Sequence, residues 1–117
     1  MNKRIRKKWL KKQGLYVNPN ETWSLDITIA KFILPRLKLF KKLTNGYPGT
    51  GEMDTFEKWI KAIDKMIWSF EKILSEDNYY GIKICGNPNW KEEYNQIQSK
   101  IDEGLMLFTK WFQSLWW

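Results

Sequence analysis

Apolar residues recur at helical spacing in three stretches of the chain. The clearest case is residues 55–74, where the intervals alternate between four and three. Its apolar positions are Phe56, Ile60, Ile63, Ile67, Phe70 and Leu74. Because an α-helix turns by about 100° per residue, this spacing places all of them on one face. Residues 24–43 and 90–115 carry similar stripes, so the pattern predicts three long helices.

Two stretches rich in turn-forming residues separate these helices. Residues 45–53 hold three glycines and a proline, and residues 75–89 hold an Asn-Pro pair and two more glycines. Such composition is typical of loops. Short connections favour antiparallel neighbours. The sequence therefore predicts an all-α fold, a small antiparallel bundle of three long helices, in a single domain spanning residues 14–117.

The first long helix interrupts its own apolar stripe with a charge. The stripe consists of Ile29, Phe32, Ile33, Phe40 and Leu43. Arg36 falls near the centre of this stripe, within about 20° of Ile29. A buried guanidinium stays protonated and needs a carboxylate, carbonyl groups or a bound anion as its partner. Pro35 lies beside it, removes a backbone donor and is expected to kink the helix.

The charge of the chain is very unevenly distributed. The net charge is +7 over 117 residues, and residues 13–117 hold 13 basic and 13 acidic residues. The whole excess lies in a basic arm, residues 1–13, whose cations are Lys3, Arg4, Arg6, Lys7, Lys8, Lys11 and Lys12. Clustered cations of this kind contact nucleic-acid phosphates, and a solvated tail is the alternative. Ile5, Trp9 and Leu10 could form one side of a short helix there.

Composition excludes several classes of chemistry. The chain has no histidine and one cysteine, which removes Ser-His and Cys-His nucleophile systems and an internal disulfide. We therefore expect a non-enzymatic protein without a cofactor. No apolar run approaches the roughly 20 residues of a membrane-spanning helix, and no apolar leader is visible at the N-terminus. Membrane association is accordingly not expected.

The predicted bundle brings Arg36 toward the acidic edge of the second helix. One hypothesis is a structural ion pair with Asp64 or Glu71. Another is a polar pocket for a phosphate-bearing ligand, because indole rings stack on bases and cations bind phosphates. The residues of this predicted pocket are Trp23, Asp26, Lys31, Arg36, Lys38, Asp64, Trp68, Glu71 and Trp111. A third hypothesis is a divalent metal held by Asp26, Asp64 and Glu71.

Three segments in a fixed order resemble a family of small proteins encoded by tailed bacteriophages and prophages. They are the Trp-Ser-Leu-Asp segment 23–26, the Met-Ile-Trp-Ser-Phe-Glu segment 66–71, and Gly104 to Phe108 followed by Lys110 and the terminal Leu-Trp. The resemblance covers most of the chain from about residue 20. The loop after the first helix is shorter than the family pattern. Lys65 stands where the family pattern has an acid. The resemblance implies a phage origin and action in the host cytoplasm on host machinery or defence.

These observations lead to two hypotheses about function. The first is a counter-defence protein that sequesters a small anionic nucleotide-derived ligand, such as a cyclic or ADP-ribose-type immune signal, in the Arg/Trp-lined pocket. The alternative is an accessory protein that binds nucleic acid or a host protein through the basic arm. Gly104 on the core face predicts a close helix approach or a ligand contact. Trp116 and Trp117 raise the prospect of a homo-oligomer.

Overall fold

The computed structural model describes residues 2–117, and every regular element in that range is a helix. The α-helices are α1 (Lys3–Lys12), α2 (Leu25–Leu43), α3 (Phe56–Ile73) and α4 (Trp90–Lys110). Two short 3₁₀ helices, η1 (Pro19–Thr22) and η2 (Phe112–Ser114), precede α2 and follow α4. The predicted all-α class is confirmed, and the basic arm contributes a helix of its own.

The predicted helix boundaries agree within one residue at five of their six ends. The exception is the C-terminus of the third helix, which was predicted at residue 115, whereas α4 ends at Lys110. Trp111 leaves the helical conformation at φ −107° and ψ 16°. This turn lets its indole pack edge-on against Trp59, with ring centroids 6.2 Å apart. Pro35 lies inside α2, which is continuous on both sides of it, and the kink stays a prediction.

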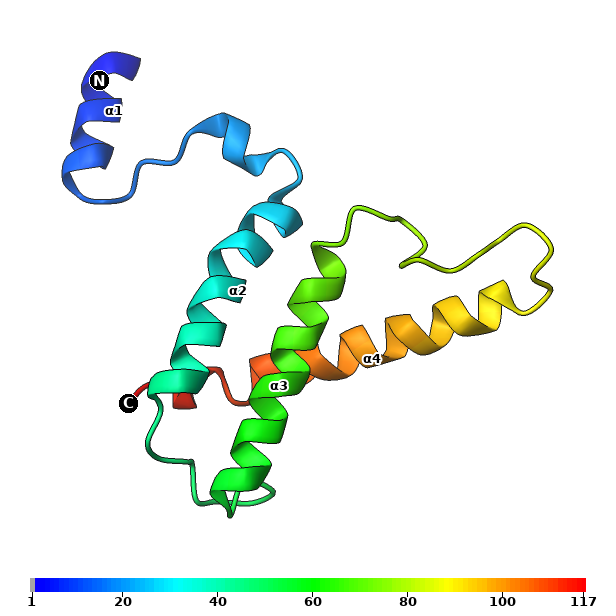
Figure 1. Ribbon diagram of the computed structural model, residues 1–117. Helices are drawn as coiled ribbons and strands as arrows, with labels where there is room; N and C mark the ends of the chain where they lie inside the picture. The colour runs from blue at the N-terminus through cyan, green and yellow to red at the C-terminus, as the bar shows by residue number, and fades with distance from the viewer. Residues whose placement is uncertain (1) are drawn as a thin grey trace.

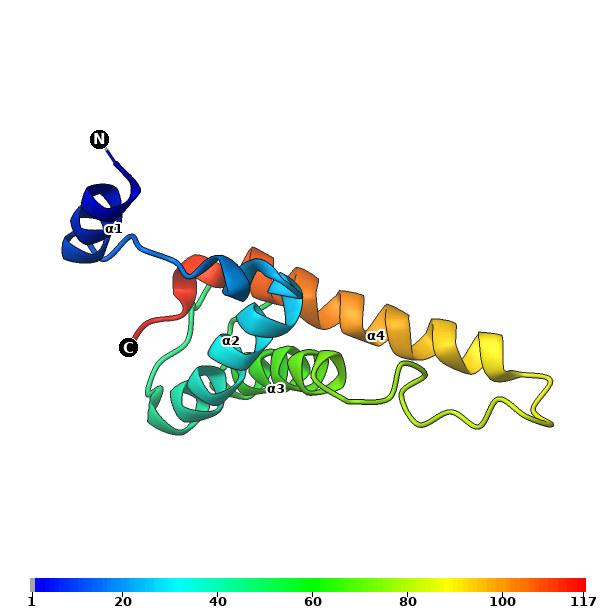
Figure 2. The same cartoon turned by 90° about the horizontal axis from the view of Figure 1, so that it is seen from above.

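Helix α3 is the centre of the fold (Figure 1). It packs against both α2 and α4, whereas the backbones of α2 and α4 do not approach each other closely and only their side chains share an apolar cluster. α2 runs alongside α3 in the opposite direction, and α4 crosses α3 obliquely, so its N-terminal half extends beyond the other helices (Figures 1 and 2). The arrangement is therefore a small, open helical bundle around one helix, in which α2 and α3 are antiparallel and α4 crosses α3 obliquely.

The core lies on the side of α3 that includes Ile63 and Phe70 of the predicted stripe and the neighbouring Trp59 and Met66, whereas Phe56 at the start of the stripe is 42% exposed. Trp59, Ile63 and Met66 are fully buried. Two apolar clusters meet along the helix, one around Met66 and Phe70 and the other around Trp59 and Ile63. Neighbouring side chains from α2, α4 and the C-terminal segment complete both clusters. The helix that carries the strongest sequence pattern is thus the one that packs against both α2 and α4.

The crossing of α3 and α4 is a close approach between small residues. Gly104 is buried on α4 opposite Ser69 of α3, whose hydroxyl donates to the carbonyl oxygens of Ile101 at 3.0 Å and Lys100 at 3.3 Å. A Cβ at Gly104 would come within 2.5 Å of the Lys65 carbonyl oxygen and closer still to Ser69 Oγ. The close helix approach predicted from Gly104 is therefore present, because only glycine leaves room for it.

Helix α2 has two apolar faces, and the predicted stripe overlaps both: Ile33 and Phe40 pack against the core, whereas Ile29, Phe32 and Leu43 are exposed. Its buried residues are Ala30 and Leu37, with Ile33 and Leu34 packed beside them. The residues on the opposite side, here called the outer stripe, are exposed by 45% to 59%: Leu25, Ile29, Phe32, Leu39 and Leu43. At about 100° per residue all five lie within a narrow sector. The stripe predicted to face the core thus faces partly outward.

Replacing Gly104 with alanine should destabilise the fold by about 3 kcal/mol, because the added methyl group collides with backbone of α3 that cannot rotate away. Chemical denaturation measures this difference. Ser69→Ala is the matched control, expected to cost only about 1 kcal/mol for its lost hydrogen bonds. A Gly104→Ala protein as stable as the wild type would contradict the close approach.

Candidate functional site

The basic arm forms a well-defined helix. Asn2 caps its N-terminus, where its side chain accepts from the Ile5 amide at 2.9 Å. Gly14, at φ 70°, ends it in a Schellman motif, in which the Leu15 amide donates to the Leu10 carbonyl at 2.8 Å. The short helix that Ile5, Trp9 and Leu10 predicted is therefore α1, and local hydrogen bonds define both of its ends.

Helix α1 is detached from the body of the protein and strongly cationic. It packs against no other described helix and buries none of its residues (Figures 1 and 2). None of its seven basic side chains forms a salt bridge within residues 2–117. At helical spacing six of them cover one half of the helix, opposite Ile5 and Trp9. Lys7 and Lys11 lie 5.1 and 5.3 Å from the ring centre of Tyr16.

Arg36 is not the buried arginine that the sequence predicted. It is exposed, its guanidinium carbon lies 3.7 Å from the centre of the Phe32 ring, and its Nη1 donates to the Phe32 carbonyl at 2.9 Å. The predicted ion pair with Asp64 or Glu71 is wrong. Those carboxylates bind lysines of α2, Glu71 with Lys38 at 3.1 Å and Asp64 with Lys41 at 2.6 Å. The reason is that Arg36 belongs to the outer stripe, which points away from α3.

The carboxylates proposed as metal ligands do not gather. Asp64 and Glu71 are each engaged by a lysine, and Asp26 is exposed in the first turn of α2. Across residues 2–117, no three carboxylate or thiol groups are close enough to hold an ion together. The metal hypothesis built on Asp26, Asp64 and Glu71 is therefore not supported.

The three tryptophans expected to wall one pocket lie in three different places. Trp23 precedes α2 and is 82% exposed. Trp111 packs into the core beside Trp59, with its indole N–H buried and unpaired. Trp68 is half-buried on α3 beside the α4 crossing. The predicted pocket is consequently not assembled, and Lys31 is an exposed side chain of α2.

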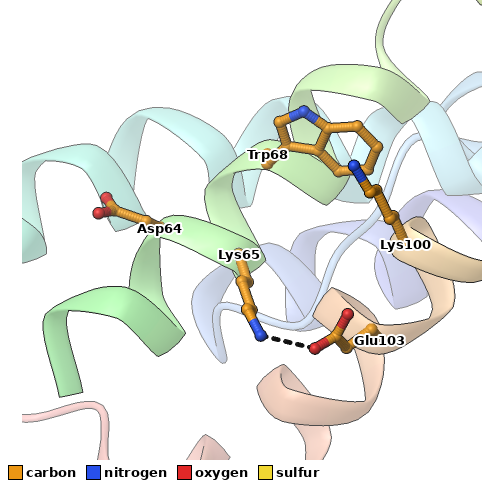
Figure 3. Close-up of a pocket in the computed structure, with 5 residues that line it drawn as sticks. All are labelled: Asp64, Lys65, Trp68, Lys100 and Glu103. Carbon is orange, nitrogen blue, oxygen red and sulfur yellow. Dashed lines mark hydrogen bonds and ion pairs between the residues drawn. The ribbon is translucent and has the colours of Figure 1, made fainter. Parts of the chain in front are cut away.

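Trp68 does line an open hollow of about 320 Å³ between α3 and α4 (Figure 3). The other side chains around it are Asp64, Lys65, Lys100 and Glu103. Lys65 and Glu103 pair across its edge at 2.7 Å, and Asp64 turns away from the other residues. The ammonium groups of Lys100 and Lys72 lie 5.8 and 5.6 Å from the Trp68 ring. Neither lysine forms a salt bridge within residues 2–117. Lys100 lines the hollow, whereas Lys72 lies near the Trp68 ring but outside that lining.

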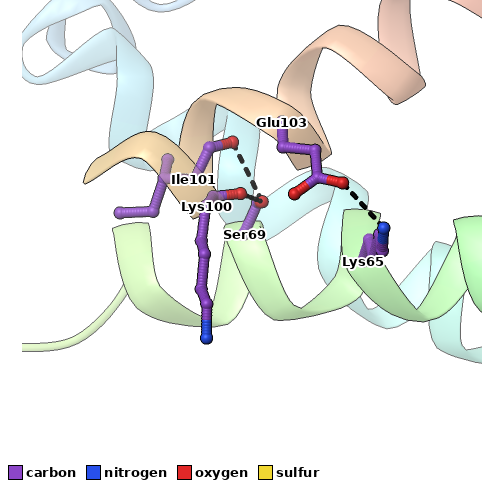
Figure 4. Close-up of polar contacts among 5 residues, drawn as sticks. All are labelled: Lys65, Ser69, Lys100, Ile101 and Glu103. Atoms are coloured by element: carbon purple, nitrogen blue, oxygen red, sulfur yellow. Dashed lines mark hydrogen bonds and ion pairs between the residues drawn. The ribbon is translucent and has the colours of Figure 1, made fainter. Parts of the chain in front are cut away.

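The helix crossing positions this hollow. Ser69 and Gly104 hold α3 and α4 close together, with the Lys65–Glu103 pair and Lys100 beside that contact (Figure 4). Lys65 precedes Ser69 by one helical turn, and Lys100 precedes Gly104 by one turn. Sequence reasoning singled out Gly104 but missed these lysines, because their proximity depends on which residue of α3 meets that glycine.

The pKa values of two side chains depart from their usual ranges, and both side chains lie in the loops on either side of α3. A hydrogen bond and charge attraction from Lys58, 2.8 Å away, lower the pKa of the exposed Asp54 carboxyl. Burial raises the pKa of the Tyr80 phenol, which donates to Gln98 at 3.1 Å. Both groups belong to the loops that enter and leave α3, so their shifts reflect helix capping and local packing.

The chain matches no protein-family model, no curated protein and no solved structure in the three comparisons made with known proteins. Within residues 2–117, no helix combines the length and apolar character that crossing a membrane requires. The function must therefore be inferred from the residues and their arrangement. They offer two features with distinct chemistry, the cationic helix α1 and the Trp68 hollow.

Replacing Arg36 with methionine should change the free energy of unfolding by no more than about 0.5 kcal/mol, as for other exposed positions. Breaking a buried ion pair would cost about 3 to 5 kcal/mol. Urea denaturation distinguishes the two results. A loss of about 3 to 5 kcal/mol in the free energy of unfolding would mean that Arg36 is buried and paired, and would contradict its exposed position.

Proposed function

We propose that the protein is a non-enzymatic nucleic-acid-binding accessory protein that acts through α1. The observation that carries this proposal is that the whole net charge of the chain is concentrated on one detached helix. Its cations have no carboxylate partners in the described part of the chain. Cations that are already neutralised within the protein cannot displace counterions from nucleic acid, whereas these can.

The geometry of α1 suits a phosphate backbone. Its ten residues extend for about 15 Å, and the cations on one side present a continuous charged surface of that length. The opposite side carries Ile5 and Trp9, exposed by 54% and 50%, and faces away from a phosphate backbone bound by the cations. No acidic residue of the arm opposes binding. The proposal predicts affinity for the backbone rather than for a base sequence.

The expected signature is strong salt dependence. If six or seven phosphates are contacted, the logarithm of the association constant for a duplex should fall with the logarithm of salt concentration with a slope of about −6. The triple variant Lys3→Ala, Lys7→Ala, Lys11→Ala should reduce that slope by about 3. Fluorescence anisotropy with a labelled mixed-sequence duplex measures both slopes.

The matched control removes three exposed lysines from the body, Lys42→Ala, Lys61→Ala and Lys83→Ala, which lowers the net charge equally. Its slope should equal that of the wild type. Equal losses from the two triple variants would show that net charge alone drives binding, and would contradict a role for α1. An unlabelled single-stranded competitor then tells whether α1 prefers duplex or single strand.

The Trp68 hollow favours a second candidate function, the binding of a small anionic nucleotide. An indole flanked by Lys72 and Lys100 offers a stacking surface with cations at its margin for phosphates. This candidate retains the counter-defence hypothesis but moves its site from Arg36 to the α3–α4 crossing. Phage origin and action in the host cytoplasm remain predictions from the resemblance under either function.

Lys100→Ala should weaken binding of a nucleotide in this hollow by tenfold or more, as expected for losing a charge-assisted contact of about 1.5 to 3 kcal/mol. Lys61→Ala, an exposed lysine of the same helix as Trp68, should have no effect. Isothermal titration with ADP-ribose and with a cyclic dinucleotide provides the measurement. If the wild-type protein binds neither compound, the hollow has no such role.

A further inference from the structure

The outer stripe of α2 is an apolar surface without a partner inside the chain. Its members occupy one sector along the whole helix and are about half exposed. An open groove of about 320 Å³ adjoins it, lined by Phe32, Arg36, Phe108, Phe112 and Leu115. Phe112, like Phe32, is 59% exposed. A contiguous apolar surface of this kind marks an interaction site on most proteins.

The exposed area of the whole chain is too large for a monomer of this size. A compact protein of 14.2 kDa exposes about 6,800 Å², whereas this chain exposes 9307 Å². Its radius of gyration is 18.6 Å, against about 13 Å for a compact domain of the same length. The detached α1 accounts for part of the surplus, and the outer stripe with its groove contributes another part.

From these observations we infer that the outer stripe is the interface of a homodimer, in which it packs against the same stripe of a second copy. A stable dimer buries about 800 Å² from each partner, well within the surplus area. The outer stripe and the groove beside it are suited to an isologous contact, in which Phe32 of each copy enters the groove of the other. The tail tryptophans, which the sequence suggested for subunit contact, are not needed for this interface.

The charge distribution of the body is also compatible with a second copy binding at the outer stripe. Outside the basic arm the chain holds equal numbers of acidic and basic residues, so two bodies approach without net repulsion. Lys38 and Lys41, which flank the buried side of α2, are already neutralised by α3. The guanidinium of Arg36 lies over the Phe32 ring, 3.7 Å from its centre, and donates to the Phe32 carbonyl at 2.9 Å, so its charge is held against its own helix. This explains an arginine in the middle of the stripe.

Sedimentation velocity of the full chain, from low to high micromolar concentration and under reducing conditions because Cys85 is exposed, tests this inference. We expect twice the chain mass of 14.2 kDa. Phe32→Glu should halve the observed mass, because two carboxylates would be buried in the interface. Met106→Glu, on an α4 residue that is 73% exposed, should leave the dimer intact. A wild-type monomer at every concentration, or a Phe32→Glu dimer, would overturn the inference.

Cross-linking tests the face directly and does not depend on the folding of Phe32→Glu. In a Cys85→Ser background, Arg36→Cys lies near the middle of the outer stripe and should form an intermolecular disulfide on mild oxidation. Met106→Cys in the same background should remain reduced. If Arg36→Cys does not cross-link, or if both positions cross-link equally, the outer stripe is not the dimer interface. Neither experiment involves nucleic acid, so its outcome is independent of the proposed function.

Discussion

The close contact of Ser69 with the Gly104 segment is the constraint on which the rest of the structure depends. This contact lets the backbones of α3 and α4 approach closely where the helices cross. The Ser69 hydroxyl fixes the register by donating to two carbonyl groups of α4. With the crossing fixed, Ile101 is buried on α3, and α4 leads the chain to the turn where Trp111 meets Trp59. The same crossing opens the Trp68 hollow, because helices that cross obliquely diverge on both sides of their contact.

Because the fold is built around a single central helix, the other helices leave much of their surface exposed. α3 buries Trp59, Ile63, Met66 and Phe70 because α2 and α4 cover it from two sides. Those two helices do not cover one another, so each keeps a face that the chain itself leaves open. The open face of α2 is apolar. Helix α1, which no other helix covers, is cationic. The two exposed surfaces differ in chemistry and point to different partners, an apolar protein surface for α2 and a polyanion for α1.

Arg36 shows how a correct local observation led to a wrong structural conclusion. Its position within an apolar stripe was read correctly, and the need of a buried guanidinium for a partner is sound. The error lay in assuming that the whole stripe faces α3. Helix α2 carries a second set of apolar residues, Ala30, Leu34 and Leu37, and these pack against α3 instead. The carboxylates of α3 then meet Lys38 and Lys41, which lie on the side of α2 that faces them.

The sequence by itself determined the helical class, the limits of α2 and α3, the detached charge of the arm and the special position of Gly104. These follow from periodicity, turn residues and the absence of a side chain, all of which act within a few residues. Only the tertiary structure decided which face of α2 is buried, which carboxylate meets which lysine, and that Trp23, Trp68 and Trp111 lie apart. The physical reason is that these outcomes depend on the crossing angle and register of helices far apart in sequence. Ser69 and Gly104 set them for α3 and α4, whereas α2 packs on α3 through its own buried residues and the ion pairs of Lys38 and Lys41.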